Sequence, residues 1–335
     1  MEELKEIGEF GLIARIRAKW GRELPGVVRG IGDDAAVIEP GKESLLLCTC
    51  DSLIEGVHFD LRLTTPYLLG RKAAAVNLSD IAAMGGTPTH LILALGLPAR
   101  LPLAFVDEFF RGLGEMSRSF DVDLVGGDTC ASPDRLFITV TLLGEARQGR
   151  FVGRHSARVG DQIMVTGFLG DSALGLQVLR TQGPQPSGEL SPLVARHLDP
   201  QPRVHEGRWL AEHDLATAMI DLSDGLLSDL GHILEESRVG ARVFLGQVPR
   251  SPAYRAQVRA LAEDEWEPAL SGGEDYELLF TTPRYKVDRA LQLADRFKLR
   301  VTQIGEITDF ENRLELIGPD QQAYRARRRG HDHFR

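Results

Sequence analysis

Aspartates that follow apolar runs and stand beside Gly, Ser or Thr are the residues of this chain best suited to chemistry. They fall in five short segments, at residues 30–35, 48–52, 77–80, 125–129 and 220–225. Small neighbours let a ligand approach the backbone closely, and hard cations such as Mg²⁺ select carboxylate oxygens. A polyphosphate bound through several Mg²⁺ ions requires both features. The pattern therefore predicts a Mg²⁺-dependent enzyme that acts on a nucleotide.

Each segment taken alone has a simpler explanation, because Asp beside Gly or Ser is common in turns and helix caps. The recurrence favours function. Most of the segments directly follow apolar runs, such as residues 45–47, 73–76 and 123–125, and five of them exceed what turn chemistry needs.

The chain has 335 residues and a formal net charge of -9. This length is sufficient for two domains with separate cores. The acidic balance fits metal binding and argues against a nucleic-acid-binding protein, which usually has a basic excess.

Cysteine usage and hydropathy indicate the cellular compartment. Cys48, Cys50 and Cys130 lack Cys-x-x-Cys spacing, and their odd number is a poor disulfide framework. The N-terminus has no basic segment followed by an apolar one, and no apolar run reaches the roughly 18 residues of a membrane span. We expect a cytoplasmic protein with no membrane or nucleic-acid partner.

The elements that must position the aspartates follow from hydrophobic periodicity and cap residues. Thr65 before Pro66 predicts the start of a helix that ends at about Met84, so Asp80 lies near its end. Other predicted helices in this half cover residues 10–20 and 103–119. Predicted strands cover residues 35–38, 45–50, 91–97, 122–125 and 136–143.

A polar stretch at 147–160 predicts a boundary between domains 1–146 and 147–335, each of mixed α/β or α+β character. In the second domain, predicted helices begin at Asp171 and cover residues 203–213, 223–237 and 284–297. Predicted strands there cover residues 162–166, 216–220, 276–281, 301–307 and 314–317, and a loop covers 183–192.

Familiar nucleotide-binding motifs are missing from the sequence. It contains no Gly-x-x-x-x-Gly-Lys-Ser/Thr loop and no protein-kinase motif set. The pair Gly30 and Gly32 lacks the third glycine of a dinucleotide site and precedes two acids. Those acids would repel a pyrophosphate unless metal ions intervened.

Six blocks of sequence together resemble the thiamine-monophosphate kinase family. They read GIGDDA, DSLIEGVHF, AVNLSDIAAMG, GGDT, DLSDGL and SGGEDYEL, at residues 30–35, 51–59, 75–85, 126–129, 221–226 and 271–278. The resemblance extends from about residue 8 to Phe334 in the family's order.

The resemblance implies the two-domain fold shared with aminoimidazole ribonucleotide synthetase. Residues 1–146 would bind ATP and Mg²⁺ and dimerise through their sheet, and residues 147–335 would form an α/β sandwich that binds substrate and nucleotide. The implied reaction is ATP-dependent phosphorylation of thiamine monophosphate to thiamine diphosphate in a homodimer. Several Mg²⁺ ions would assist a direct in-line transfer, with metals bridging phosphates.

The resemblance also implies roles for particular residues. The Mg²⁺ shell would include Asp34, Thr49, Cys50, Asp51, Asp80, Asp128, Asp221 and Asp224. ATP would contact Phe110, Gly127, Asp128, Arg154 and Ser223. Thiamine monophosphate would contact His58, Glu274 and His331. Asp51, Asp128 and Arg154 would be catalytic, with Arg154 stabilising the transferring phosphoryl group.

Several of these residues also have ordinary structural explanations. His58 could be a hydrogen-bonded loop residue, Arg154 an exposed linker arginine, and Glu274 a solvent-facing acid. The basic run at 325–329 is typical of a solvated tail and receives no role.

Two positions depart from the family pattern. Cys50 stands where Thr is usual, so any metal contact there would come from its backbone carbonyl, because thiols suit Mg²⁺ poorly. His331 stands where an aromatic residue usually stacks on the substrate, and an imidazole would pack less well.

Other enzymes of the superfamily are one alternative, and a non-catalytic ATP- or metal-binding module is another. Selenophosphate synthetase needs a reactive residue near its N-terminus, and the carbamoyl-dehydrating maturation protein needs a C-terminal cysteine. The cysteines of this chain lie between residues 48 and 130. Substrate-dependent ADP release would distinguish an enzyme from a binding module.

Overall fold

The computed structural model describes residues 27–29, 36–38, 44–183, 191–328 and 330–331. The predicted helix at 10–20, the turn at 30–34 and the candidate metal ligand Asp34 lie outside these ranges.

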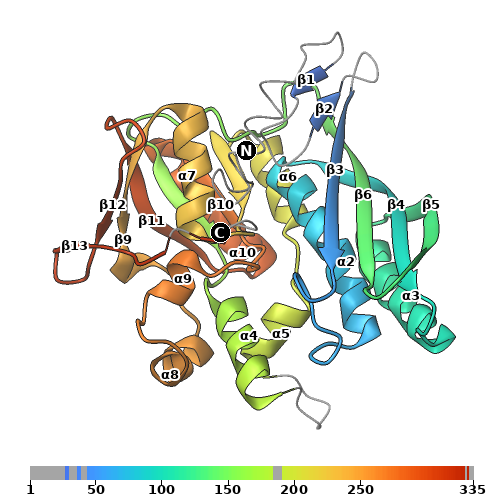
Figure 1. The fold of residues 1–335 in the computed structure, drawn as a ribbon. Helices are drawn as coiled ribbons and strands as arrows, with labels where there is room; N and C mark the ends of the chain where they lie inside the picture. Colours follow the sequence, from blue (N-terminus) through green and yellow to red (C-terminus); the bar gives the residue numbers. More distant parts are fainter. Residues whose placement is uncertain (1–26, 30–35, 39–43, 184–190, 329, 332–335) are drawn as a thin grey trace, which may run out of the picture.

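The N-terminal half forms a six-stranded sheet of order β1-β2-β3-β6-β4-β5. Its strands are β1 (Val27–Arg29), β2 (Ala36–Ile38), β3 (Ser44–Ile54), β4 (Thr87–Pro98), β5 (Asp123–Ser132) and β6 (Phe137–Arg147). Helices α2 (Pro66–Ala83) and α3 (Leu103–Arg118) cover one of its faces (Figure 1). Apolar side chains that alternate along β3, β4 and β6 pack beneath them.

Helix α2 is the most informative element for function. Its Thr65 cap accepts a hydrogen bond from the backbone N–H of Leu68 at 3.2 Å, and Pro66 occupies the first turn, as the sequence predicts. A Cβ atom on Gly70 would lie 2.0 Å from a backbone oxygen of Phe109 in α3. The two helices therefore approach so closely that glycine is required there.

The C-terminal half forms a seven-stranded sheet of order β13-β12-β9-β11-β7-β10-β8. Its strands are β7 (Gln162–Thr166), β8 (Ala218–Asp221), β9 (Gly240–Phe244), β10 (Leu278–Thr282), β11 (Val301–Thr308), β12 (Leu314–Ile317) and β13 (Ala323–Tyr324). Its helices are α4 (Asp171–Gln182), α5 (Pro192–Leu198), α6 (Val204–Glu212), α7 (Leu226–Ser237), α8 (Pro252–Leu261), α9 (Glu267–Ser271) and α10 (Val287–Phe297), with 3-10 turns η1 (Leu245–Gln247) and η2 (Arg284–Lys286).

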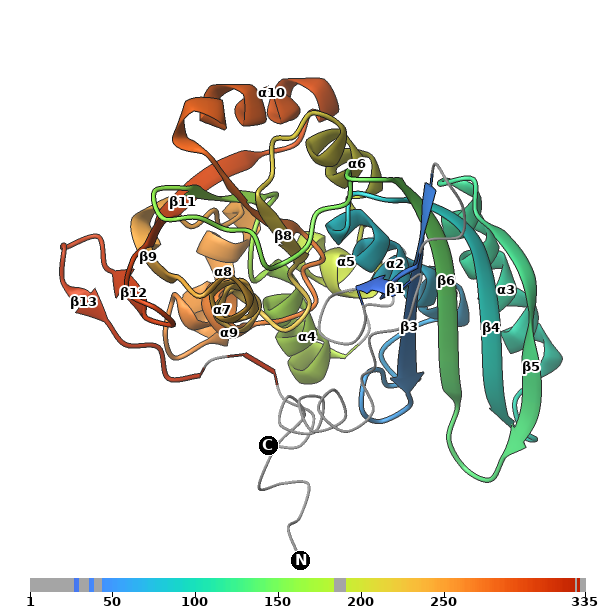
Figure 2. The same ribbon diagram turned by 90° about the horizontal axis from the view of Figure 1, so that it is seen from above.

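Helices α6 and α10 pack on one face of this sheet, and α4, α7, α8 and α9 pack on the other (Figure 2). Alternation along β10 explains the two layers, because Phe280 joins the first cluster and Leu279 the second. The first cluster is continuous with the core of the N-terminal half. Helix α2 lies at this junction, where a Cβ on Gly207 of α6 would sit 2.0 Å from a backbone oxygen of Ala82.

The predicted mixed α/β class and most predicted elements are confirmed. Strands β3 and β5 are longer than predicted, so Asp51 and Asp128 lie inside strands rather than after them. The sequence patterns did not predict β1, α5, β9, η1, α8, α9 and β13. Each is short, and the start of α8 shows that a signal was present, because Ser251 caps it and Pro252 opens it.

In the described part of the chain, no helix combines the length and apolar character needed to cross a membrane.

Candidate active site

Strand β3 and helix α2 carry the first part of the site. Thr49, buried in β3, donates a hydrogen bond from Oγ1 to Oδ2 of Asp80 in the last turn of α2. The backbone N–H of Asp51 donates to Oδ1 of Asn77 at 3.2 Å. Thr49 and Asp51 are two residues apart in β3 and therefore lie on the same face of the strand, which faces α2.

Asp221 of the second domain contacts the same end of α2. It is the last residue of β8, and its buried Oδ2 accepts a hydrogen bond from Oγ of Ser79 at 2.6 Å. Ser79 and Asp80 are neighbours on α2. The end of this helix therefore gathers acidic residues from both domains.

The phenol of Tyr276 shows how closely these acids are gathered. Tyr276 is buried, and burial is the main reason that its pKa lies well above its ordinary value. Nearby carboxylates raise the pKa further, and they belong to Glu274, Asp51, Asp221 and Asp80. The neutral phenol of Tyr276 thus lies near carboxylates from both domains.

The chemistry of the donors fits Mg²⁺ that retains ligands from outside the protein. The gathered groups are carboxylate and hydroxyl oxygens, which hard cations prefer. Among the described residues, no three His, Cys, Asp or Glu side chains are placed to hold a metal ion by themselves. Mg²⁺ commonly binds through one or two carboxylates together with waters and substrate phosphates.

A second acidic loop follows β8. The backbone N–H groups of Asp224 and Gly225 donate to Oδ2 of Asp229 at 3.2 and 3.0 Å. Burial raises the pKa of Asp229 well above its ordinary value, and Asp224 and Asp221 raise it further. Asp229 is therefore the internal anchor of the loop that carries Ser223 and Asp224.

Arg154 lies beside this loop, in the segment between β6 and β7. Its carbonyl accepts a hydrogen bond from Oγ of Ser237 at 2.8 Å. Burial, with a contribution from the nearby Arg154, lowers the pKa of His232 to about 4. Arg154 also opposes the rise in the pKa of Asp229. The residue is half-buried and its charge acts on α7, whereas Arg158 is exposed.

His331 reaches the same loop from the C-terminal end of the chain. Its backbone N–H donates to the carbonyl of Asp224 at 3.1 Å. Figure 1 shows the C-terminal segment returning toward α7 and α9. The structure thus places the predicted substrate residue beside a predicted metal ligand.

Glu274 and His58 lie near each other on the other side of the acidic residues. Glu274 is tied to the Asp224 loop, because its N–H donates to the carbonyl of Ser223 at 2.7 Å. The pKa of Glu274 lies below its ordinary value, because Lys72, His197 and His58 outweigh the effect of burial. His58 accepts a hydrogen bond at Nδ1 from the N–H of Ile54 at 3.0 Å.

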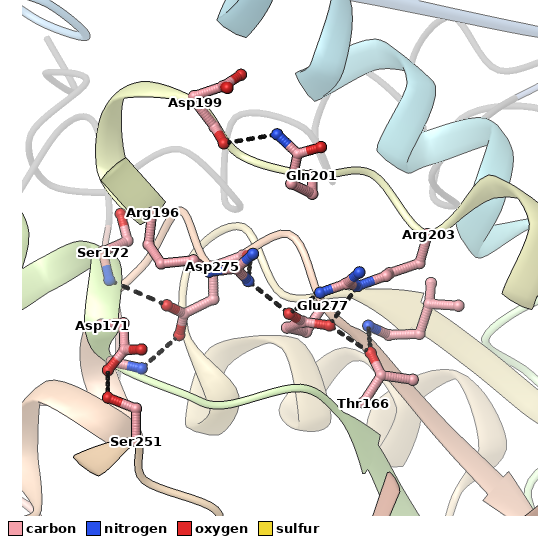
Figure 3. A network of polar contacts seen from close by, with 12 residues as sticks. Thr166, Asp171, Ser172, Arg196, Asp199, Gln201, Arg203, Ser251, Asp275 and Glu277 are labelled. Atoms are coloured by element: carbon pink, nitrogen blue, oxygen red, sulfur yellow. Dashed lines mark hydrogen bonds and ion pairs between the residues drawn. The ribbon is translucent and has the colours of Figure 1, made fainter. Parts of the chain in front are cut away.

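The residues after Glu274 hold its loop to the domain core (Figure 3). Asp275 accepts hydrogen bonds from the N–H groups of Gly170 and Ser172, at 2.6 and 3.3 Å, and so caps α4. Burial raises the pKa of Asp275 to about 8. Glu277 is paired with Arg196 and Arg203, with 2.7 Å between Arg203 Nε and Oε2.

Phe110, Gly127 and Asp128, three of the predicted nucleotide residues, line one hollow. It has a volume of about 340 Å³ and lies between β4, β5 and α3. A Cβ on Gly127 would meet the carbonyl oxygen of Leu93 at 1.8 Å, so no larger residue fits there. Its lining combines the apolar side chains of Leu93, Leu95 and Phe110 with the carboxylate of Asp128.

This hollow is separate from the other acids within one chain. Asp51 is level with Val140 in β6, Val140 with Leu93 in β4, and Leu93 with Gly127 in β5. Three strand spacings amount to about 14 Å. One chain therefore does not bring Asp128 to the same Mg²⁺ ion as Asp51, whose ligands would lie about 2 Å from the metal.

Cys50 faces away from the acidic residues. It is exposed, alternates with Thr49 and Asp51 along β3, and its Sγ accepts a hydrogen bond from Oγ1 of Thr141 at 3.4 Å. Its thiol therefore points to the face of the sheet opposite α2. Only its backbone remains for a contact with a metal at the acidic site.

Five residues that shape this site have no role predicted from the sequence. They are Lys72, Asn77, Ser79, Asp229 and Tyr276. For Ser79, helical spacing was a usable signal, because it follows Lys72 by two turns and shares its face of the helix. For Tyr276 the sequence offers no comparable signal, because its surroundings come from four distant segments.

Comparison with known proteins agrees with this architecture. Residues 32–146 match the family "AIR synthase related protein, N-terminal domain", and residues 158–316 match "AIR synthase related protein, C-terminal domain". The fold and site thus define a two-domain protein of the AIR synthase related class. The chain belongs, within that class, to the thiamine-monophosphate kinase family.

Relatives of this family cover nearly the whole chain. The thiamine-monophosphate kinase of Escherichia coli (strain K12) is 42% identical over 332 residues, which are 98% of each chain. That of Bacillus subtilis (strain 168) is 34% identical, over 91% of this chain and 93% of the relative. The solved structure "AaThiL complexed with AMPPCP and TMP" has a TM-score of 0.85 and 35% identity, over 99% of both chains.

Proposed function

We propose that this chain transfers the γ-phosphoryl group of ATP to thiamine monophosphate, giving thiamine diphosphate. The observation that carries the proposal is the meeting of Asp80, Asp221 and Asp51 at the end of α2, from two domains. Membership of the thiamine-monophosphate kinase family supports it. A relative solved with AMPPCP and TMP supports the two substrates.

Mg²⁺ belongs to the proposal, and its candidate ligands among the described residues are Asp51, Asp80 and Asp221, the Thr49 hydroxyl and Asp224. When bound, the metal would offset the negative charge of the phosphates that must approach each other. Residues of the chain would bind and orient the phosphates. The charge of Arg154 acts on Asp229, which anchors the loop that carries Ser223, so Arg154 and this loop can hold and orient a phosphate.

Direct in-line transfer suits these residues. The acceptor is a phosphate, which is already ionised near neutral pH, so no general base is needed. The reacting atoms need to be held within roughly 3–3.5 Å of each other. Catalysis then depends on positioning and charge stabilisation, for which Arg154 is the suitable side chain.

The activity is tested by thiamine diphosphate formation from ATP and thiamine monophosphate. We expect product with Mg²⁺, none with excess EDTA, and a loss of about a hundredfold or more in kcat for Asp51→Asn. ADP release should require thiamine monophosphate. Tight ATP binding without any product from folded wild-type protein would contradict the function and favour the binding-module alternative.

A homodimer is the second part of the proposal. Ile54 and Ile92, on the sheet face opposite α2 and α3, are 39% and 37% exposed, and Leu124 and Val125 of edge strand β5 are 46% and 56% exposed. Apolar side chains so exposed on one sheet suit a covering partner. The 14 Å gap to Asp128, from the strand spacing, also suits a site completed by a second copy.

Complementation between inactive variants tests this arrangement. If Asp51 of one copy works with Asp128 of the other, a mixed dimer of Asp51→Asn and Asp128→Asn contains one intact site. After random exchange, about a quarter of the wild-type kcat per site should return. Mixed dimers confirmed by mass spectrometry but without activity would show that each chain uses its own Asp128, or that the copies do not share a site.

The boundary between domains 1–146 and 147–335 also stays a proposal, as does cytoplasmic residence without nucleic-acid or membrane partners. The described cysteines Cys48, Cys50 and Cys130 are free thiols, which is compatible with a reducing compartment.

A further inference from the structure

Lys72 is a buried lysine of α2 at the junction of the two domains. Its side chain is 4% exposed, and its Nζ lies 2.5 Å from Oε1 of Glu274. Lysine is almost never buried to this extent unless it is paired. The pairing thus joins the helix that carries Asp80 to the loop that carries a predicted substrate residue.

The backbone of Glu274 is held in an unfavourable conformation. Its φ is +65°, in the left-handed region, although the neighbouring Gly272 and Gly273 could have adopted that conformation without strain. Strained residues of this kind concentrate at binding sites. The Glu274 side chain remains 28% exposed, so part of its carboxylate is open to a ligand.

His197 is the third member of this group and has a different role. Its Nδ1 lies 3.3 Å from Oε2 of Glu274 and 3.1 Å from Oγ of Ser172. Burial lowers the pKa of His197 to about 4, with Lys72 adding to the effect, so the ring is neutral at neutral pH. Both contacts use the same ring nitrogen, which excludes a Ser-His-Glu relay. Lys72 therefore supplies the positive charge in this group.

Helix geometry links this group to the acidic residues. Lys72 and Ser79 are seven residues apart, which places them on one face of α2 and about 10 Å apart along its axis. Lys72 holds Glu274 at one end, and Ser79 holds Asp221 at the other. One rigid helix thus fixes the distance between the two ends of the site.

We propose that Lys72 is a positioning residue that orients Glu274 as the hydrogen-bond acceptor for the amino-bearing ring of thiamine monophosphate, with the phosphate toward Asp80 and Asp221. The inference rests on the proposed function. Because Lys72 neutralises Glu274, the ring is selected by a directed hydrogen bond rather than by net negative charge. Lys72 itself does not touch the substrate.

The test separates KM from kcat in Lys72→Met. We expect KM for thiamine monophosphate to rise about tenfold or more, with kcat and the KM for ATP within about threefold of wild type. Arg71→Met is the matched control, because Arg71 makes a neighbouring ion pair between the domains, 2.7 Å from Asp199. That control should lose stability without a change in KM for thiamine monophosphate.

A double-mutant cycle with Glu274→Gln keeps the test decisive if Lys72→Met alone does not fold. In the double variant no buried charge is left unpaired, and its KM for thiamine monophosphate should equal that of Glu274→Gln alone. A further rise in KM of about tenfold in the double variant would overturn the inference, as would equal KM changes for both substrates. A wild-type protein without activity would instead refute the proposed function.

Discussion

Replacing Asp221 by Asn should lower kcat by about a thousandfold and leave the protein folded. Asparagine keeps the size of the side chain and an oxygen that can accept the hydrogen bond of Ser79. The lost charge is one of those gathered at the end of α2, where the phosphates would bind. Steady-state kinetics at saturating ATP, thiamine monophosphate and Mg²⁺ measure the effect.

The stability of this variant separates loss of chemistry from loss of structure. Asp221 raises the pKa values of Asp229 and Tyr276, which shows that it repels nearby negative charge. Its neutralisation should leave the thermal midpoint unchanged or raise it. Asp288→Asn, the same change on exposed α10, should keep full activity. A loss of less than about tenfold in kcat for Asp221→Asn would remove this carboxylate from the mechanism.

Replacing Glu277 by Gln has the largest expected effect on stability, a fall of about 10 °C in the thermal midpoint. The Glu277 side chain is 1% exposed and is paired with Arg196 and Arg203. Breaking one side of a buried pair costs about 3–5 kcal/mol, because the remaining charges are left uncompensated. A shift of about 2–4 °C for each kcal/mol gives that fall for a domain of this size.

The pH dependence of the stability difference between wild type and Glu277→Gln shows whether the charge of Glu277 causes it. The two arginines and the hydroxyl of Thr166 outweigh burial, so the pKa of Glu277 lies below its ordinary value. A lowered folded-state pKa gives stability that is present above the unfolded value of about 4.3 and is lost as pH falls further. The wild type and the variant should therefore converge in acid.

A half-exposed ion pair provides the control for Glu277. Glu306 lies 3.2 Å from Arg242, and both side chains are more than a third exposed. Glu306→Gln should change the free energy of unfolding by less than about 1 kcal/mol, because solvent screens such pairs. If Glu277→Gln and Glu306→Gln both lowered the free energy of unfolding by the same small amount, the buried network of Figure 3 would not be what holds the Glu274 loop.

The sequence was most informative where local rules decide structure. Thr65, Pro66 and Gly85 bound α2 as predicted, because capping and φ preferences act over a few residues. Strand lengths were less predictable. Asp51 continues β3 because Val140 of β6 pairs with it, and that partner lies far away in the sequence.

The candidate site shows the same division. The residue types of Asp80, Asp221 and Glu274 were sufficient to predict an acidic, metal-dependent site for phosphates. Their joint placement depends on Ser79 and Lys72, whose contacts span 142 residues for Ser79 to Asp221 and more for Lys72 to Glu274. Contacts between residues so far apart in the sequence produce no periodic sequence pattern from which they could be predicted.

By itself, the sequence determined the class of the fold and the family, and it predicted the chemistry of the metal ligands, because these depend on residue type and short-range order. Tertiary structure decided which residues share a site. It placed Asp51, Asp80 and Asp221 around one helix end, turned the Cys50 thiol to the other face of its sheet, and left Asp128 three strands away. The physical reason is that strand alternation, sheet order and the packing of α2 between two domains set these distances, and each depends on contacts between remote segments.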